Sequence, residues 1–202
     1  MAKLQGKSPL ITGAAAGLGK GIAEVYAKYG ARLCLADTSP DVDATAQALR
    51  DTYGAEVITA IVDVSQRADM QAAVARTLAQ FGQLDIVCCN AGVARLAPFE
   101  AMSDELLDLH INVNIRGVWN TCQAAIAPML SQGGGVIVIA SSVTGDIVAD
   151  AGEAAYALSK SALVGLTKAL AVEYAARNIR VNCTQLGYAR TPMVEKIGRA
   201  HV

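Results

Sequence analysis

The amino-acid sequence predicts a doubly wound α/β fold, in which helices cover both faces of a parallel β-sheet. Short apolar runs alternate with longer segments of helical period, which is typical of this class. The runs are apolar at successive positions, as expected for strands that are buried on both faces. The chain has 202 residues, of which 53% are hydrophobic and 17% are charged, so we interpret residues 1–202 as one folded domain rather than a disordered chain.

The expected strands and helices alternate in order along the chain. The predicted strands are Pro9–Thr12, Leu33–Ala36, Val57–Val62, Leu84–Cys89, Val136–Ala140 and Ile179–Cys183. The predicted helices are Leu18–Tyr29, Asp41–Tyr53, Arg67–Phe81, Asp104–Leu130 and Glu153–Arg177. Three glycines, Gly30, Gly54 and Gly82, follow helices at the left-handed position that favours glycine. Phe99 and Trp119 are interpreted as packing residues rather than site residues.

Composition excludes several classes of function. Lys and Arg total 17 against 18 Asp and Glu, and the net charge is −1, so no basic surplus indicates nucleic-acid binding. The five cysteines have no spacing typical of a zinc site or a disulfide scaffold, and we expect no bound metal. The sequence has neither a signal-peptide segment nor an apolar run of membrane-spanning length. We therefore expect a cytoplasmic protein that does not enter a membrane.

A glycine-rich segment lies where the first strand meets the first helix. It reads Thr12-Gly13-Ala14-Ala15-Ala16-Gly17-Leu18-Gly19, with the spacing G-x-x-x-G-x-G. Glycines at such a turn let a pyrophosphate approach main-chain N–H groups at the helix N-terminus. A Walker A loop is excluded, because the chain has Ala14 and Gly21 where that loop needs Gly and Ser or Thr. The segment indicates a dinucleotide site, although a turn without a ligand can have the same composition.

Asp37 indicates which dinucleotide is bound. It ends the second predicted strand, where a carboxylate accepts hydrogen bonds from adenosine ribose hydroxyls and repels a 2′-phosphate. Ala16 and Thr38 supply no cation for such a phosphate, although Arg32 lies upstream. NAD is therefore predicted in preference to NADP. Asp37 could instead cap the helix that follows it.

Further motifs follow in an order that is typical of one enzyme family. They are Asp63-Val64 after the third strand, Asn90-Ala91-Gly92 after the fourth, Asn114 within the fourth helix, Ser142 after the fifth strand, and Tyr156 and Lys160 in a Y-x-x-x-K motif. Together with the glycine segment, this order resembles the short-chain dehydrogenase/reductase family over the whole chain. The resemblance implies a Rossmann-type fold and a cofactor site formed by Thr12, Gly13, Gly17, Leu18, Gly19, Asp37, Asp63, Val64, Asn90, Ala91, Gly92, Tyr156, Lys160, Gly187, Ala189 and Thr191.

The catalytic set is predicted to be Asn114, Ser142, Tyr156 and Lys160. Tyr156 and Lys160 lie four residues apart and share a helix face. A nearby ammonium and the positive nicotinamide of NAD⁺ would lower the pKa of the Tyr156 phenol, so that it could act as a general base. Ser142 could hydrogen-bond the reacting oxygen. The resemblance implies that Lys160 also holds the nicotinamide ribose and that Asn114 positions a water for proton relay.

The chain departs from the family pattern in two places. Leu186 stands where proline is usual, just before the segment Gly187–Thr191 that the resemblance assigns to the nicotinamide end. Loss of proline permits a looser segment. Family members continue well beyond Met193 with a lid helix and a seventh strand, whereas this sequence stops at Val202. We therefore expect a C-terminally incomplete domain without the C-terminal strand and lid.

The leading functional prediction is an NAD(H)-dependent oxidoreductase that interconverts a secondary alcohol and a ketone by hydride transfer. A non-catalytic NAD-binding sensor or scaffold is the alternative, and epimerisation or dehydration with tightly held NAD is a third. Within the family, segments 141–156 and 187–193 are most similar to UcpA-type oxidoreductases. The expected partner is a small alcohol or carbonyl compound. The helices Asp104–Leu130 and Glu153–Arg177 carry apolar residues beyond one core-facing stripe, so we also expect a homodimer or homotetramer.

Overall fold

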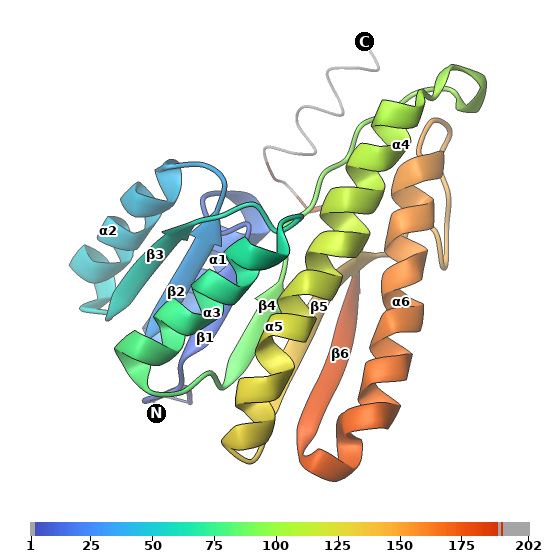
Figure 1. The fold of residues 1–202 in the computed structure, drawn as a ribbon. Helices are drawn as coiled ribbons and strands as arrows, with labels where there is room; N and C mark the ends of the chain where they lie inside the picture. Colours follow the sequence, from blue (N-terminus) through green and yellow to red (C-terminus); the bar gives the residue numbers. More distant parts are fainter. Residues whose placement is uncertain (1–2, 190, 192–202) are drawn as a thin grey trace.

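The computed structural model describes residues 3–189 and 191, which contain a six-stranded sheet (Figure 1). Its strands are β1 (Pro9–Thr12), β2 (Leu33–Asp37), β3 (Val57–Ile61), β4 (Ile86–Cys89), β5 (Gly135–Ser142) and β6 (Ile179–Leu186). They lie in the order β3-β2-β1-β4-β5-β6, and all neighbours are parallel, which confirms the predicted fold class. The expected loss of a C-terminal strand and lid concerns the chain beyond Met193, outside the described residues. That residues 1–202 form one domain stays a prediction.

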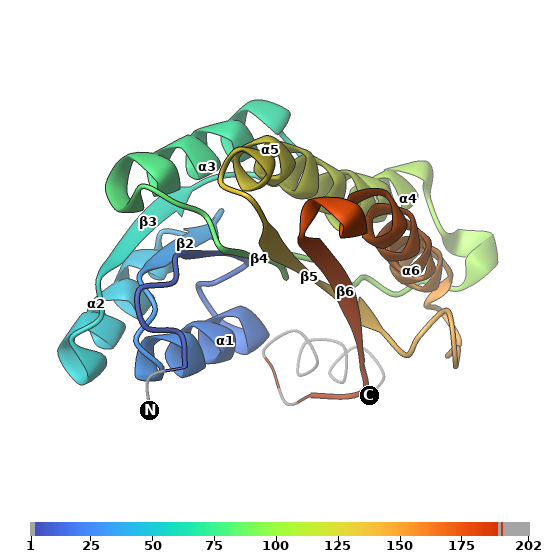
Figure 2. The same cartoon turned by 90° about the horizontal axis from the view of Figure 1, so that it is seen from below.

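Helices cover both faces of the sheet (Figure 2). On one face lie α1 (Gly17–Lys28) and α2 (Asp41–Tyr53), and on the other lie α3 (Arg67–Phe81), α4 (Asp104–His110), α5 (Gly117–Ser131) and α6 (Ala154–Tyr174). Gly30, Gly54 and Gly82 have positive φ angles of 86°, 61° and 75°, as predicted for residues that end helices. Within the described part of the chain, no helix is both long enough and apolar enough to span a membrane.

Burial on both faces explains why the strand sequences are continuously apolar. All four residues of β4 are buried, and they alternate between two apolar clusters. Ile86 and Cys88 pack in the cluster on the α1 and α2 side, while Val87 and Cys89 pack in the cluster on the α3 and α5 side. β5 and β6 extend beyond their predicted ends, to Ser142 and Leu186, and so reach the predicted catalytic region.

The predicted helix Asp104–Leu130 is helical throughout but is not a uniform α-helix. A π-helical segment, Ile111–Arg116, joins α4 to α5. Segments of this kind are rare and often occur at functional sites. The sequence did not predict it, because the same apolar periodicity suits an α-helix. The buried Asn114 lies in this segment.

The two aromatic residues that were interpreted as packing residues lie largely outside the core. Phe99 begins a short 3₁₀ helix, η1 (Phe99–Ala101), and is 80% exposed, while Trp119 on α5 is 50% exposed. A second 3₁₀ helix, η3 (Ala175–Arg177), follows α6. Aromatic character alone does not determine which side of a helix faces the sheet.

Candidate functional site

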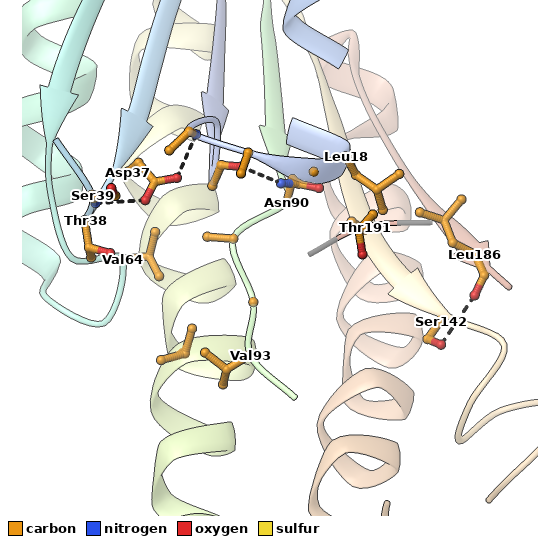
Figure 3. A pocket seen from close by; sticks show the side chains of 18 of the residues that line it. Leu18, Asp37, Thr38, Ser39, Val64, Asn90, Val93, Ser142, Leu186 and Thr191 are labelled. Atoms are coloured by element: carbon orange, nitrogen blue, oxygen red, sulfur yellow. Dashed lines mark hydrogen bonds between the residues drawn. The ribbon is translucent and has the colours of Figure 1, made fainter. Parts of the chain in front are cut away.

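The carboxyl ends of the strands border a cleft of about 540 Å³, at the point where the strand order reverses between β1 and β4. Figure 3 shows Asp37 toward one side of this cleft and Ser142 toward the other, with Asn90 between them. The predicted site residues that line the cleft are Gly13, Gly17, Leu18, Asp37, Asp63, Val64, Asn90, Ala91, Gly92, Ser142, Tyr156, Lys160, Gly187, Ala189 and Thr191. Thr12, Gly19 and Asn114 do not line it.

The glycine segment connects β1 to α1, and side chains behind it fix its shape. Thr12 Oγ1 accepts hydrogen bonds from the backbone N–H groups of Asn90 and Ala91, at 3.0 and 3.1 Å. The side-chain amide of Asn90 donates to the carbonyl oxygens of Thr12 and Gly13. A Cβ at Gly19 would overlap the Gly13 carbonyl oxygen, so only glycine fits there. Thr12 and Gly19 therefore fix the conformation of the glycine loop, although neither residue lines the cleft.

Asp37 ends β2, and its carboxylate orders the backbone around it (Figure 3). Oδ2 accepts a hydrogen bond from the Ala15 N–H at 2.9 Å, and Oδ1 accepts one from the Ser39 N–H at 3.0 Å. The helix α2 starts after Pro40 with no side-chain cap, so Asp37 does not cap it. Among the described residues, no Lys or Arg lines the cleft beside Asp37.

Ser142, Tyr156 and Lys160 come together in the part of the cleft bordered by β5 and α6. The Ser142 hydroxyl, at the end of β5, donates to the Leu186 carbonyl at 3.4 Å (Figure 3). Lys160 is only 6% exposed, and its Nζ donates to the Ala140 carbonyl at 2.7 Å. The same Nζ lies 5.7 Å from the centre of the Tyr156 ring. A phenol, a hydroxyl and a buried cation are therefore held together.

The protein groups alone raise the pKa of Tyr156, whereas the predicted lowering included the positive charge of bound NAD⁺. Burial raises this pKa above the ordinary value of 10.0, a hydrogen bond with Ser142 lowers it, and the charge of Glu153 raises it further. Burial also lowers the pKa of Lys160, to about 8. Lys160 alone therefore does not bring this pKa below its ordinary value, and the lowering expected with NAD⁺ bound stays a prediction. Desolvation dominates at Tyr156, and the lysine makes its short hydrogen bond to Ala140.

Asn114 is fully buried in the π-helical segment behind the cleft. Its Oδ1 accepts from the Val93 N–H at 2.8 Å, and its amide donates to the Val93 carbonyl and to Ser159 Oγ, both at 2.9 Å. These bonds engage both amide hydrogens. The side chain therefore ties the segment after β4 to the helix α6. Its predicted role in proton relay stays a prediction.

Several residues that line the cleft were not predicted as site residues. They are Ala15, Ala16, Thr38, Ser39, Asp41, Val62, Val93, Val113, Ala140, Ser141 and Leu186. Most are chain neighbours of predicted residues at the carboxyl ends of strands, so the topology of the sheet could have indicated them. Val113 is different, because it comes from the π-helical segment, which no local pattern predicted.

Comparison with known proteins gives consistent matches. A family model described as short chain dehydrogenase matches residues 7–201. The chain is 52% identical over 199 residues to oxidoreductase UcpA of Salmonella typhimurium, a match that covers 98% of this chain and 75% of that protein. A short-chain type dehydrogenase/reductase from Mycobacterium marinum has a TM-score of 0.94 at 35% identity, with 99% of this chain and 80% of that chain covered. Carveol dehydrogenase from Mycobacterium avium, in complex with NAD, has a TM-score of 0.91 at 33% identity, with 96% and 75% covered.

Proposed function

Since the chain belongs to the short-chain dehydrogenase/reductase family, we propose that it interconverts a secondary alcohol and a ketone by hydride transfer with NAD(H). The observation that carries this proposal is that Ser142, Tyr156 and Lys160 line the same cleft as the glycine loop and Asp37. Oxidation of an alcohol needs a group that accepts its proton and a partner for its oxygen, next to a hydride acceptor. The three side chains supply the first two requirements.

The lining of the cleft fits an extended dinucleotide. The glycine loop places backbone N–H groups at the start of α1, where a pyrophosphate is favoured. A Cβ at Gly13 would lie 2.8 Å from the Ala91 Cα, so glycine allows these two segments of the lining to approach closely. Asp37 suits ribose hydroxyls and repels a 2′-phosphate, which favours NAD over NADP. The NAD complex of carveol dehydrogenase, which shares the fold, supports this assignment.

Each catalytic side chain has a distinct proposed role. NAD, when bound, supplies the hydride acceptor for oxidation. Tyr156 takes the proton of the substrate hydroxyl in oxidation and returns it in reduction. Because burial raises the pKa of Tyr156, its phenolate needs positive charge nearby, and Lys160 is the cationic side chain of the described lining. Ser142 donates a hydrogen bond to the reacting oxygen. Asn114 stays in the proposed set for proton relay, with its side chain already bonded to its neighbours.

We also propose that the protein is a cytoplasmic homodimer or homotetramer. Trp119 on α5 and Leu158 and Val172 on α6 are exposed large apolar side chains. The two helices cover the same face of the sheet (Figure 2). Such surfaces are commonly buried by isologous two-fold contacts. Light scattering at micromolar concentration would contradict this proposal if it gave a monodisperse monomer.

A panel of secondary alcohols with NAD⁺, followed by the absorbance of NADH, tests the proposed activity. Tyr156→Phe removes the proton-transferring hydroxyl, so turnover should fall about a hundredfold or more, while the Kd for NAD stays within about twofold of the parent value. Near-normal turnover by this variant would exclude Tyr156 as the general base. NAD binding by the parent protein without turnover of any alcohol would favour the sensor or scaffold alternative.

A further inference from the structure

His110 is a fully buried histidine at the end of α4 with a hydrogen-bond partner for each ring nitrogen. Nδ1 lies 2.8 Å from the Leu106 carbonyl oxygen, and the Arg95 backbone N–H donates to Nε2 at 3.1 Å. Because the Arg95 N–H can only donate, Nε2 must be the unprotonated nitrogen, and Nδ1–H donates to Leu106. The ring is therefore held in one tautomer and one orientation.

His110 and Asn114 lie one helical turn apart and hold the same segment of chain. Asn114 bonds the N–H and the carbonyl of Val93, and His110 accepts from the N–H of Arg95. The backbone of residues 93–95 is thus bound by two buried side chains of the helix that runs from α4 into the π-helical segment. These residues directly follow the cleft-lining segment Asn90–Gly92, and Val93 itself lines the cleft (Figure 3).

Residues 92–95 and His110 lie close to the proposed catalytic groups. The His110 ring meets the Tyr156 ring edge to face, with ring centres 6.4 Å apart and an interplanar angle of 75°. A Cβ placed on Gly92 would lie 3.6 Å from Lys160 Nζ, so little space separates this backbone from the lysine. A shift of residues 92–95 would therefore change the surroundings of Lys160 directly and those of Tyr156 through His110.

We propose that His110 is a positioning residue, which fixes residues 93–95 through the hydrogen bond from Arg95 and so holds the wall of the cleft beside Tyr156. This inference rests on the proposed function for its effect on turnover. The contacts of the adenosine and pyrophosphate parts do not depend on it, because the glycine loop and Asn90 are bonded to each other and to Thr12. His110 should therefore influence turnover much more than cofactor affinity.

Two substitutions separate the hydrogen bond from the ring. His110→Phe keeps a ring beside Tyr156 but removes the acceptor, and His110→Gln keeps an acceptor but removes the ring. The first readout is hydrogen exchange of the Arg95 amide in the full-length protein. We expect slow exchange in the parent protein and in His110→Gln, and exchange faster by about tenfold or more in His110→Phe. Fast exchange of Arg95 in the parent protein would overturn the proposal even if a variant fails to fold.

The second readout is turnover together with NAD binding. For His110→Phe we expect kcat/KM for the alcohol to fall about tenfold to a hundredfold, with the Kd for NAD within about twofold, and His110→Gln should restore most of the loss. Thr77→Val is the control, because it breaks a buried hydrogen bond to Ala73 on α3 outside the cleft lining. Equal losses in His110→Phe and Thr77→Val, or in His110→Phe and His110→Gln, would overturn the proposal. A parent protein that turns over no alcohol would count against the proposed function, whereas the exchange readout would still decide whether His110 holds Arg95.

Discussion

Replacing Lys160 by Met is expected to stabilise the cofactor-free protein at pH 7 while abolishing turnover. The Lys160 ammonium is 6% exposed, and burial lowers its pKa from 10.5 to about 8. Burial therefore penalises the charged form that the proposed mechanism needs. Methionine has a similar length without the charge, so it can fill the same space without this penalty.

The magnitude follows from the pKa of Lys160. The difference between 10.5 and about 8 corresponds to about 3 kcal/mol, at about 1.4 kcal/mol for each tenfold change in the acid constant. Losing the hydrogen bond to the Ala140 carbonyl offsets about 1 kcal/mol of this gain. The free energy of unfolding of Lys160→Met should thus exceed that of the parent by about 2 kcal/mol, and Tm should rise by about 4–8 °C.

The pH dependence provides a stricter test. Since the folded-state pKa of Lys160 lies below its unfolded value, the unfolded parent binds more protons between pH about 8 and 10.5. The stability of the parent relative to Lys160→Met should therefore rise with pH across this window. The excess free energy of unfolding of Lys160→Met over the parent should be complete below about pH 8 and largely absent near pH 10.5.

Urea unfolding of the two proteins at pH 7 and near pH 10 measures this difference directly. Lys168→Met is the control, because Lys168 lies exposed on the same helix and its removal changes the net charge equally. We expect Lys168→Met to leave the free energy of unfolding within about 0.5 kcal/mol of the parent. If Lys160→Met were less stable than the parent at pH 7, or if the difference did not shrink near pH 10, the desolvation argument would be refuted.

Three other substitutions test separate parts of the cleft. Asp37→Ala with Thr38→Arg removes the charge that repels a 2′-phosphate and adds a cation, so calorimetry should show the NADP-to-NAD affinity ratio rising about tenfold or more; a parent that already prefers NADP would contradict this. Glu153→Gln removes a charge that raises the pKa of Tyr156, the proposed general base. The acidic limb of the pH profile of kcat/KM for oxidation should therefore move to lower pH. A limb that does not move would refute the assignment of Tyr156 as the general base. Gly19→Ala should weaken NAD binding about tenfold or more, because its Cβ would overlap the Gly13 carbonyl oxygen. Gly21→Ala has open space for its Cβ, so it should leave NAD binding unchanged and raise the free energy of unfolding by about 0.5–1 kcal/mol. Equal NAD affinities of the two variants would show that the close contact between Gly19 and Gly13 is unimportant for binding.

The sheet could be predicted from the sequence because it depends on local patterns. Strands buried on both faces must be apolar at every position, and β1 was predicted with its observed bounds. The helices α2 and α3 were also predicted with their observed bounds, since each is followed by a glycine in the left-handed conformation. The predicted residues of the cleft lining came mostly from the resemblance to the short-chain dehydrogenase/reductase family. Its motifs lie at the ends of strands, and parallel strands bring their carboxyl ends to one edge of the sheet.

The supporting polar contacts could not be predicted in the same way, because they join residues far apart in the sequence. His110 looks like an ordinary polar residue of a helix, and the motif that indicated Asn114 did not indicate its partners. Both are fully buried and bind the backbone of residues 93–95. The rise that burial causes in the pKa of Tyr156 could not be predicted for a related reason. Helix spacing shows that Lys160 lies near, but only the folded structure shows how strongly the phenol is desolvated and that Lys160 Nζ bonds to Ala140.

The glycine loop shows why a cofactor motif needs more than its own spacing. Thr12 and Asn90 are 78 residues apart, but the pairing of β1 with β4 at the reversal of strand order brings their backbones together. The Asn90 side-chain amide donates hydrogen bonds to the carbonyl oxygens of Thr12 and Gly13. Because Gly19 has no Cβ, the first turn of α1 can pack against the Gly13 carbonyl. The conformation of the loop therefore depends on the pairing of β1 with β4. NAD affinity should consequently report on the packing of β1 against β4 as well as on the glycine loop itself.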